Sequence, residues 1–297
     1  MLRPLTDNPV VLKELRGRMR GARAFIVLSV YLLLLGAFTS LIYAALTETT
    51  NSVNGEVSMG EIGRTLFGGV VAIEMLLVSF IAPAFTSGAI SGEREHQTFD
   101  LLRTTLLPPR TIVLGKLMSS MSYVLLLLLA AIPLQSIAFF FGGVAETEVI
   151  LSFVILLVTA LMFSTFGIYF SARAKRTLSA SVMTYTTATF ITFGIPILLG
   201  AVLLILGLSF DGSLSANSER ALMYGLGAAL TTNPAATALL TQYILINQRS
   251  AGLFHYTLDS GNTMLLISPW IPFIVLYLVL TLIFYVLAVR RVGRVED

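Results

Sequence analysis

A charged segment at residues 91–116, SGEREHQTFDLLRTTLLPPRTIVLGK, carries the side chains best suited to contact another protein. The candidate contact residues are Glu93, Arg94, Glu95, His96, Thr98, Phe99, Leu101 and Leu102. At a protein interface, apolar side chains supply binding energy and charges fix the register. Two prolines, Pro108 and Pro109, stop the helical pattern. The pattern predicts a short surface helix with Phe99 and Leu102 as its apolar anchors; the simpler interpretation is a solvated connector.

Residues for metal, redox or nucleotide chemistry are few and scattered. The chain has no cysteine and only two histidines, His96 and His255, which the topology below places on opposite sides of a membrane. No HExxH or GxSxG motif occurs. The one Gly–Lys pair, at positions 115 and 116, continues with leucine, so it is not a GxxxxGK[ST] loop. We expect no enzyme activity, no metal site and no cofactor here; any ATP and Mg²⁺ would bind a separate polypeptide.

Six long apolar segments must position these residues. They cover 24–46, 66–90, 117–141, 149–170, 180–208 and 270–289, and each is long enough to cross about 30 Å of hydrocarbon. Hydrophobic residues make up 56% of the chain and charged residues 12%, which excludes an ordinary soluble domain. We expect an all-α integral membrane protein with one domain: residues 1–23 at the surface, 24–208 as helices 1–5, 209–267 as an outer loop, and 268–297 as helix 6 and tail.

The basic residues set the orientation. All but three of the 19 Lys and Arg residues lie in residues 1–23, 91–116, 171–179 and 290–297. The positive-inside rule therefore places both termini in the cytoplasm and the protein in the cytoplasmic membrane. The charge is explained by topology, so nucleic acid is not an expected partner.

The N-terminal residues predict a helix that lies along the membrane surface. Asn8 followed by Pro9 is typical of a helix start. Apolar and basic residues then alternate at helical spacing: Leu12, Lys13, Leu15, Arg16 and Met19. Such a helix can lie in the inner headgroup layer with its cations near anionic lipid. The alternative is a basic tail that only directs topology.

Polar residues inside the membrane are candidates for a pathway. Glu74 is the one formally charged residue in the predicted spans, so it is either a pathway or proton-linked carboxylate, or a carboxylate satisfied by a neighbouring Ser or Thr or by the outer surface. Residues 221–246 are apolar but broken at Asn233 and Pro234, and a full crossing there would put the C-terminal arginines outside. We expect an outer re-entrant pair of half-helices that turns at Asn233 and Pro234.

The 91–116 segment also carries a family resemblance. Its Glu–Arg–Glu element, Thr98, the pair Leu101 and Leu102, and Gly115 with Lys116 resemble the permeases of the ABC-2 transporter family, although Gln97 stands where glycine is common. The resemblance implies a coupling helix between helices 2 and 3 that docks on a separate ATPase. It further implies two ATPase copies, a second permease subunit (identical or paralogous), export, and outer re-entrant helices that gate the exit.

Two other classes of membrane protein fit the same composition. A secondary transporter or channel would be expected to show more intramembrane charge or an inverted repeat. A structural membrane subunit of a larger assembly would also tolerate so apolar a chain. No charged pocket is recognisable in the spans, so lipid, drug, peptide, glycan and ion all stay open as cargo.

Overall fold

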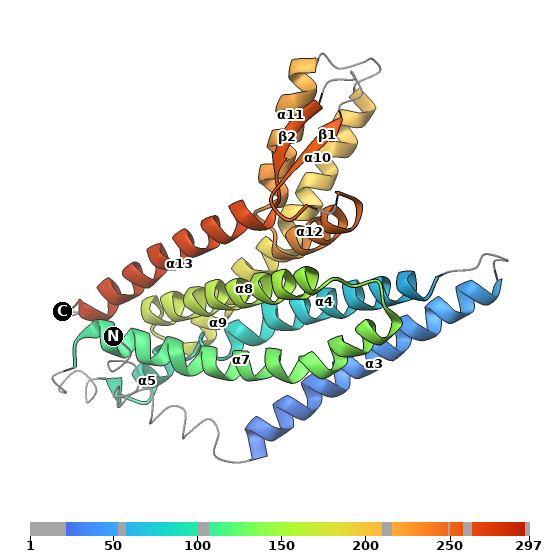
Figure 1. Cartoon of the computed structure of the whole chain (residues 1–297). Coiled ribbons are helices and arrows are strands. Elements are labelled where there is room, and N and C mark those ends of the chain that lie inside the picture. The colour runs from blue at the N-terminus through green and yellow to red at the C-terminus, as the bar shows by residue number, and fades with distance from the viewer. Residues whose placement is uncertain are drawn as a thin grey trace.

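The computed structural model describes residues 22–52, 58–99, 107–209, 216–248, 250–257 and 263–294, mostly as helices (Figure 1). Within these ranges, six helices are long and apolar enough to cross a membrane. They are α3 (Ala22–Ser52), α4 (Met59–Ala84), α7 (Pro109–Phe141), α8 (Glu146–Arg173), the continuous α9 (Thr177–Thr189), η1 (Phe190–Gly194) and α10 (Ile195–Ser209), and α13 (Trp270–Gly293). The prediction of a helical protein with six potential spans is confirmed. The predicted N-terminal surface helix lies outside the described residues, which begin at 22.

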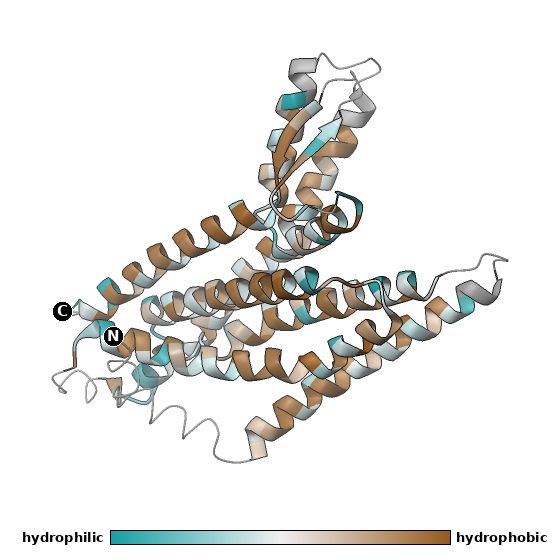
Figure 2. Ribbon diagram, in the orientation of Figure 1, coloured by the Kyte–Doolittle hydropathy of each residue, from teal (hydrophilic) through white to brown (hydrophobic). Residues whose placement is uncertain are grey.

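Helix α8 is the central element of the bundle. It packs against α4, α7, α9 and α13, and its buried side chains form the middle of the largest apolar core (Figure 1). The ring of Phe166 meets that of Phe284 on α13 edge to face, with centroids 4.5 Å apart. Figure 2 shows apolar residues along the spans and hydrophilic residues near the ends of the helices. The short helix α5 (Ser91–Glu95) lies at one of these ends.

The second span begins and ends earlier than the sequence indicated. Helix α4 starts at Met59 because the Ser58 hydroxyl accepts a hydrogen bond from the Glu61 amide at 3.3 Å. It ends at Ala84, and residues 85–90 form turns before α5. Pro83 lies within the last turn of α4. The helix gives way to a turn just after it, where the Thr86 amide donates to the Pro83 carbonyl at 3.0 Å. The predicted span of residues 66–90 is therefore displaced toward its N-terminal side.

The fifth span changes its helical form at its midpoint. Five residues, Phe190–Gly194, form the π-helix η1, in which the Ile195 amide bonds to the Phe190 carbonyl. Pro196 follows directly and donates no hydrogen bond. π-Helical turns inside α-helices are rare and are frequent at functional sites.

Helix α10, helix α11 (Ala216–Leu230) and a two-stranded ribbon extend away from the bundle as a lobe (Figure 1). The ribbon pairs β1 (Leu253–Thr257) antiparallel with β2 (Thr263–Ile267), and helix α12 (Pro234–Gln248) lies where the lobe meets the bundle. The predicted all-α class did not include this ribbon. Only Phe254 and Met264 are buried in it, so its five-residue strands carry too little alternation to be recognised in an apolar sequence.

Candidate functional site

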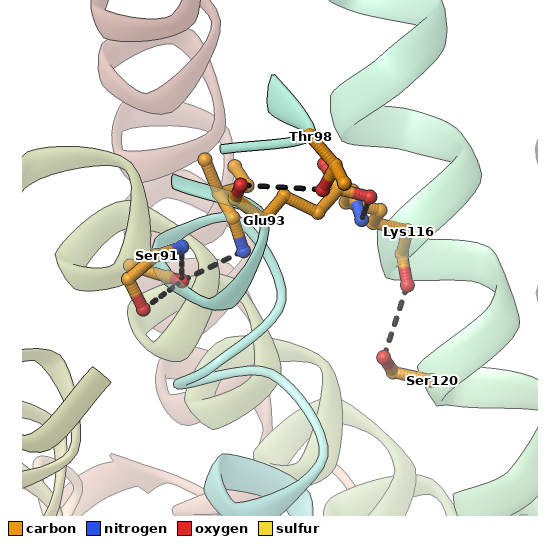
Figure 3. Close-up of polar contacts among 7 residues, drawn as sticks. Ser91, Glu93, Thr98, Lys116 and Ser120 are labelled. Atoms are coloured by element: carbon orange, nitrogen blue, oxygen red, sulfur yellow. Dashed lines mark hydrogen bonds and ion pairs between the residues drawn. The ribbon is translucent and has the colours of Figure 1, made fainter. Parts of the chain in front are cut away.

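The candidate partner-binding segment begins with α5, which is fastened to α8 by one hydroxyl. The backbone amides of Ile90 and Ser91 both donate to the Ser171 hydroxyl at 2.9 Å, and the Ser91 hydroxyl lies 3.1 Å from the same oxygen (Figure 3). These amides belong to the first turn of α5, where no helical carbonyl is available to them. Ser171 therefore satisfies the start of α5 and fixes it on the end of α8.

A buried ion pair joins the same segment to α7. The Lys116 ammonium lies 2.8 Å from Glu93 Oε1, and the lysine side chain is only 3% exposed (Figure 3). A lysine at such depth is costly unless a charge partner accompanies it. Lys116, which the sequence placed in the coupling motif, is thus an internal partner of Glu93.

Glu95 connects α5 to α9. Its two carboxylate oxygens accept from the Thr177 amide at 3.1 Å and from the Thr177 hydroxyl at 2.7 Å. Thr177 is the first residue of α9, and a carboxylate is favoured at the positive end of a helix. These hydrogen bonds from Thr177 hold the pKa of Glu95 below its ordinary value. The exposed Glu95 therefore accepts hydrogen bonds at the N-terminus of the fifth span from outside that helix, whose N-cap residue is Arg176.

The turn after α5 uses a backbone conformation that favours glycine. Gln97 has φ +57°, the left-handed region, and the following Thr98 folds back so that its amide donates to the Glu93 carbonyl at 2.9 Å. A side chain in this region costs about 1–2 kcal/mol relative to the right-handed region. The departure noted in the sequence, glutamine where glycine is common, falls on the position where glycine is physically preferred.

Phe99 requires a correction. It was predicted to project as an anchor for a partner, but its side chain is 7% exposed and belongs to the main core, with the Arg94 guanidinium 5.1 Å from the ring centroid. Its apolar ring is better satisfied inside the bundle than at the surface. His96, Gln97 and Thr98 are the exposed members of the segment next to Glu95. Leu101 and Leu102 lie outside the described residues.

Glu74 lies among three helices. It is 1% exposed, and its carboxylate accepts from the Tyr31 hydroxyl of α3 at 3.2 Å and from the Gln135 amide of α7 at 2.5 Å. The sequence suggested a neighbouring Ser or Thr as the partner of Glu74, whereas its partners are Tyr31 and Gln135. The arrangement satisfies both carboxylate oxygens, as a buried carboxylate requires, and gives Glu74 a role in holding α3, α4 and α7 together.

Asn233 occupies the turn between α11 and α12 and is 1% exposed. Its side-chain oxygen accepts from the Ala236 amide at 2.8 Å, so it caps α12, with Pro234 as the first helical residue. Its side-chain nitrogen donates to the carbonyls of Ile191 and Thr192 at 2.7 and 2.9 Å. A turn at Asn233 and Pro234 is thus present, and it is bound to η1 in the fifth span. Its outer, re-entrant position stays a prediction.

Sequence reasoning did not identify Ser171 or Thr177 as attachment points of α5, because each is an unremarkable polar residue far from the segment in the chain. Lys116 was noted only as part of the family motif and not as the partner of Glu93. In the part of the chain that the structure describes, no three metal-ligating side chains come together. No model of a known protein family matches this chain, and no curated protein sequence matches it.

Proposed function

We propose that this protein is the membrane-spanning subunit of an ATP-driven transporter. It would bind a separate ATPase through α5 and the turn that follows it. In this proposal the protein lies in the cytoplasmic membrane with both termini inside and exports its substrate. It pairs with a second permease subunit, identical or paralogous, and binds two copies of the ATPase. The observation that carries the proposal is that α5 is attached by polar contacts to three different membrane-spanning helices.

These attachments favour a docking segment over a simple connector. A solvated loop needs no fixed contacts, whereas a segment that transmits a push must be held firmly by the elements it moves. Ser171 on α8, Lys116 on α7 and Thr177 on α9 each bind a different residue of the segment. His96, Gln97 and Thr98 then face outward beside it, free of the core.

The contacts also favour one route by which a displacement of α5 would be transmitted through the bundle. A displacement of α5 would act on α9 through Glu95, and α9 continues into η1, whose carbonyls bind Asn233. The turn before α12 would therefore respond to movement at the opposite end of the bundle. This route runs through α9, which the resemblance did not indicate, and re-entrant helices that gate the exit are a natural endpoint for it.

The test is isolation of the full chain from its native membrane in mild detergent, followed by mass spectrometry of the proteins that stay bound. We expect a subunit with a phosphate-binding loop, and we expect its loss in the variants His96→Asp and Leu102→Asp. Glu146→Gln, an exposed change at the other end of α8, is the matched control. Phe99 is unsuitable for this test because its replacement would damage the core.

Repeated recovery of the wild-type protein without an ATPase would overturn the proposal and favour a secondary transporter or a structural subunit. Recovery of the ATPase with the two variants as well as with the control would retain the transporter class but reject α5 as the docking segment.

A further inference from the structure

The start of α7 and the end of α13 meet at the end of the bundle that carries α5 (Figure 1). Pro109, the first residue of α7, lies against Gly293, the last residue of α13: a β-carbon added to the glycine would come within 3.3 Å of the proline ring. Arg110 follows Pro109, and Arg290 precedes Gly293 by three residues. The packing therefore brings together two arginines that are far apart in the chain, here called the arginine pair.

The two side chains flank the line where the helices touch. The Arg110 guanidinium is near enough to the half-buried Tyr285 of α13 for an electrostatic interaction, so it is turned toward α13. Tyr285 and Gly293 are eight residues apart and lie on the face of α13 that meets α7. Arg290 lies about 60° from Gly293 around the helix, at the edge of that face.

The arginine pair has no counter-charge among the residues that the structure describes. Both guanidiniums are exposed, and neither forms an ion pair with a described carboxylate. Two described carboxylates lie at this end of the bundle. Glu93 is already paired with Lys116, and Glu95 is already bound to Thr177. Since neighbouring cations repel each other and a bound anion relieves that repulsion, the pair favours an anionic ligand.

The surface that leads to Arg290 indicates which anion fits. One stripe of α13 is exposed along the span, with fractions between 38% and 63%. Its members recur every three or four residues, and Arg290 follows the last of them by four: Val275, Val279, Leu282 and Val286. The stripe is about 16 Å long, the depth of one leaflet. Figure 2 shows the change from apolar to hydrophilic residues toward the end of α13. A soluble anion would use only the arginines, whereas a phospholipid would use the arginines and the stripe.

We propose that the arginine pair binds the headgroup of an anionic phospholipid whose acyl chain lies along this exposed stripe of α13. The phosphate accepts hydrogen bonds from both guanidiniums, whose planar forks match its oxygens. A headgroup that carries an ammonium is disfavoured, because the two arginines repel a further cation. The site therefore prefers phosphatidylglycerol over phosphatidylcholine. The inference does not depend on the proposed ATPase partner.

Arg291 provides a matched control, because it carries the same charge as Arg290 but points elsewhere. It follows Phe284 by seven residues and so shares the face on which Phe284 meets Phe166 and Tyr169 of α8. Arg291 is exposed, and in the described ranges it forms no ion pair. A general attraction between basic residues and anionic lipid would treat Arg290 and Arg291 alike, whereas a site between α7 and α13 distinguishes them.

The experiment is native mass spectrometry of the full chain in neutral detergent, with equal amounts of phosphatidylglycerol and phosphatidylcholine of the same acyl chains. We expect the first bound lipid to be phosphatidylglycerol by about tenfold or more. Arg110→Gln and Arg290→Gln should each lower this preference about fivefold, and Arg291→Gln should change it by less than about twofold. Because all three side chains are exposed, the variants should unfold like the wild type in detergent without added lipid.

Equal binding of the two lipids by the wild type would overturn the proposal. Equal losses in the three variants would also overturn it, because they would indicate general attraction. Glycerol 3-phosphate, which carries the phosphate without the acyl chains, should not displace the lipid; displacement would reject the stripe as part of the site. If Arg110→Gln and Arg290→Gln keep the lipid but lose a bound ATPase, the pair belongs to a protein interface and the proposal is wrong. Because lipid binding is measured without a partner subunit, its failure would leave the proposed transport function standing.

Discussion

The bridge at Asn233 supports a quantitative prediction, because the reason for each of its contacts can be given. In a regular α-helix the Ile191 carbonyl would accept from the amide of residue 195, but in η1 that amide bonds to Phe190 instead. The Thr192 carbonyl would accept from residue 196, which is proline. Neither carbonyl therefore has its usual α-helical partner, and the Asn233 side-chain nitrogen donates to both.

The expected cost of removing this bridge follows from its parts. Asn233→Ala loses the cap of α12, worth about 1 kcal/mol. It also loses two hydrogen bonds between helices, worth about 0.6 kcal/mol each in a membrane protein. We therefore expect the free energy of unfolding to fall by about 2 kcal/mol.

Asn233→Asp is the sharper perturbation. It has nearly the same shape and keeps an oxygen to cap α12, but it turns a donor toward two carbonyl oxygens into a negatively charged acceptor. Attraction becomes repulsion, so we expect a greater loss than with Asn233→Ala, although the cap is retained. The assay is equilibrium unfolding of the full chain in mixed micelles with a rising fraction of sodium dodecyl sulfate.

The control is Asn247, an exposed asparagine near the end of the same helix, changed to alanine and to aspartate in parallel. Both control variants should stay within about 0.5 kcal/mol of the wild type. If Asn233→Asp is as stable as the wild type, or more stable than Asn233→Ala, the assignment of the donor to the two carbonyls is wrong.

Three further predictions concern the bundle and α5. Glu74→Ala should lower the free energy of unfolding in the same assay by about 1–3 kcal/mol, because it leaves two buried donors without an acceptor, and Glu74→Gln should cost less; equal effects would reject the three-helix role. Gln97→Gly should raise the free energy of unfolding by about 0.5–1 kcal/mol, because glycine adopts the left-handed conformation without strain. A loss of stability would contradict the assignment of strain to Gln97. Because the pKa of Glu95 is lowered in the folded state, its stabilising contact is present above the ordinary glutamate pKa and is lost as pH falls through the folded value. Spin labels on cysteines placed at His96 and Leu178 should therefore separate only at pH values below the ordinary glutamate pKa, and this response should vanish in Glu95→Gln.

Much of the architecture follows from the sequence because a bilayer constrains it so strongly. Backbone groups in hydrocarbon must be satisfied within a helix, so long apolar runs become spans whatever their partners are. Pro234 after Asn233 likewise marks a helix start that depends only on neighbouring residues. The existence of the spans and of the turn at Asn233 could therefore be predicted.

The boundaries of the spans were predicted less accurately from the sequence, because several competing local interactions determine where a helix begins and ends. Residues 85–90 are apolar enough to extend α4, yet a turn follows Ala84, and the attachment of Ser91 to α8 sets the start of a new helix. The ribbon of β1 and β2 was missed for a related reason: its pairing is between strands and leaves little periodic trace in five residues.

Only the tertiary structure decided which polar residues meet. Glu95 and Thr177 are 82 positions apart, and Asn233 and Ile191 are 42 apart, so no local pattern relates them. It also decided that Phe99 faces inward, because a phenylalanine near a charged loop suits a core and a docking surface equally well by composition. The sequence determined which residues had to be buried or satisfied; the packing of α8 against its neighbours determined which partner satisfied each of them.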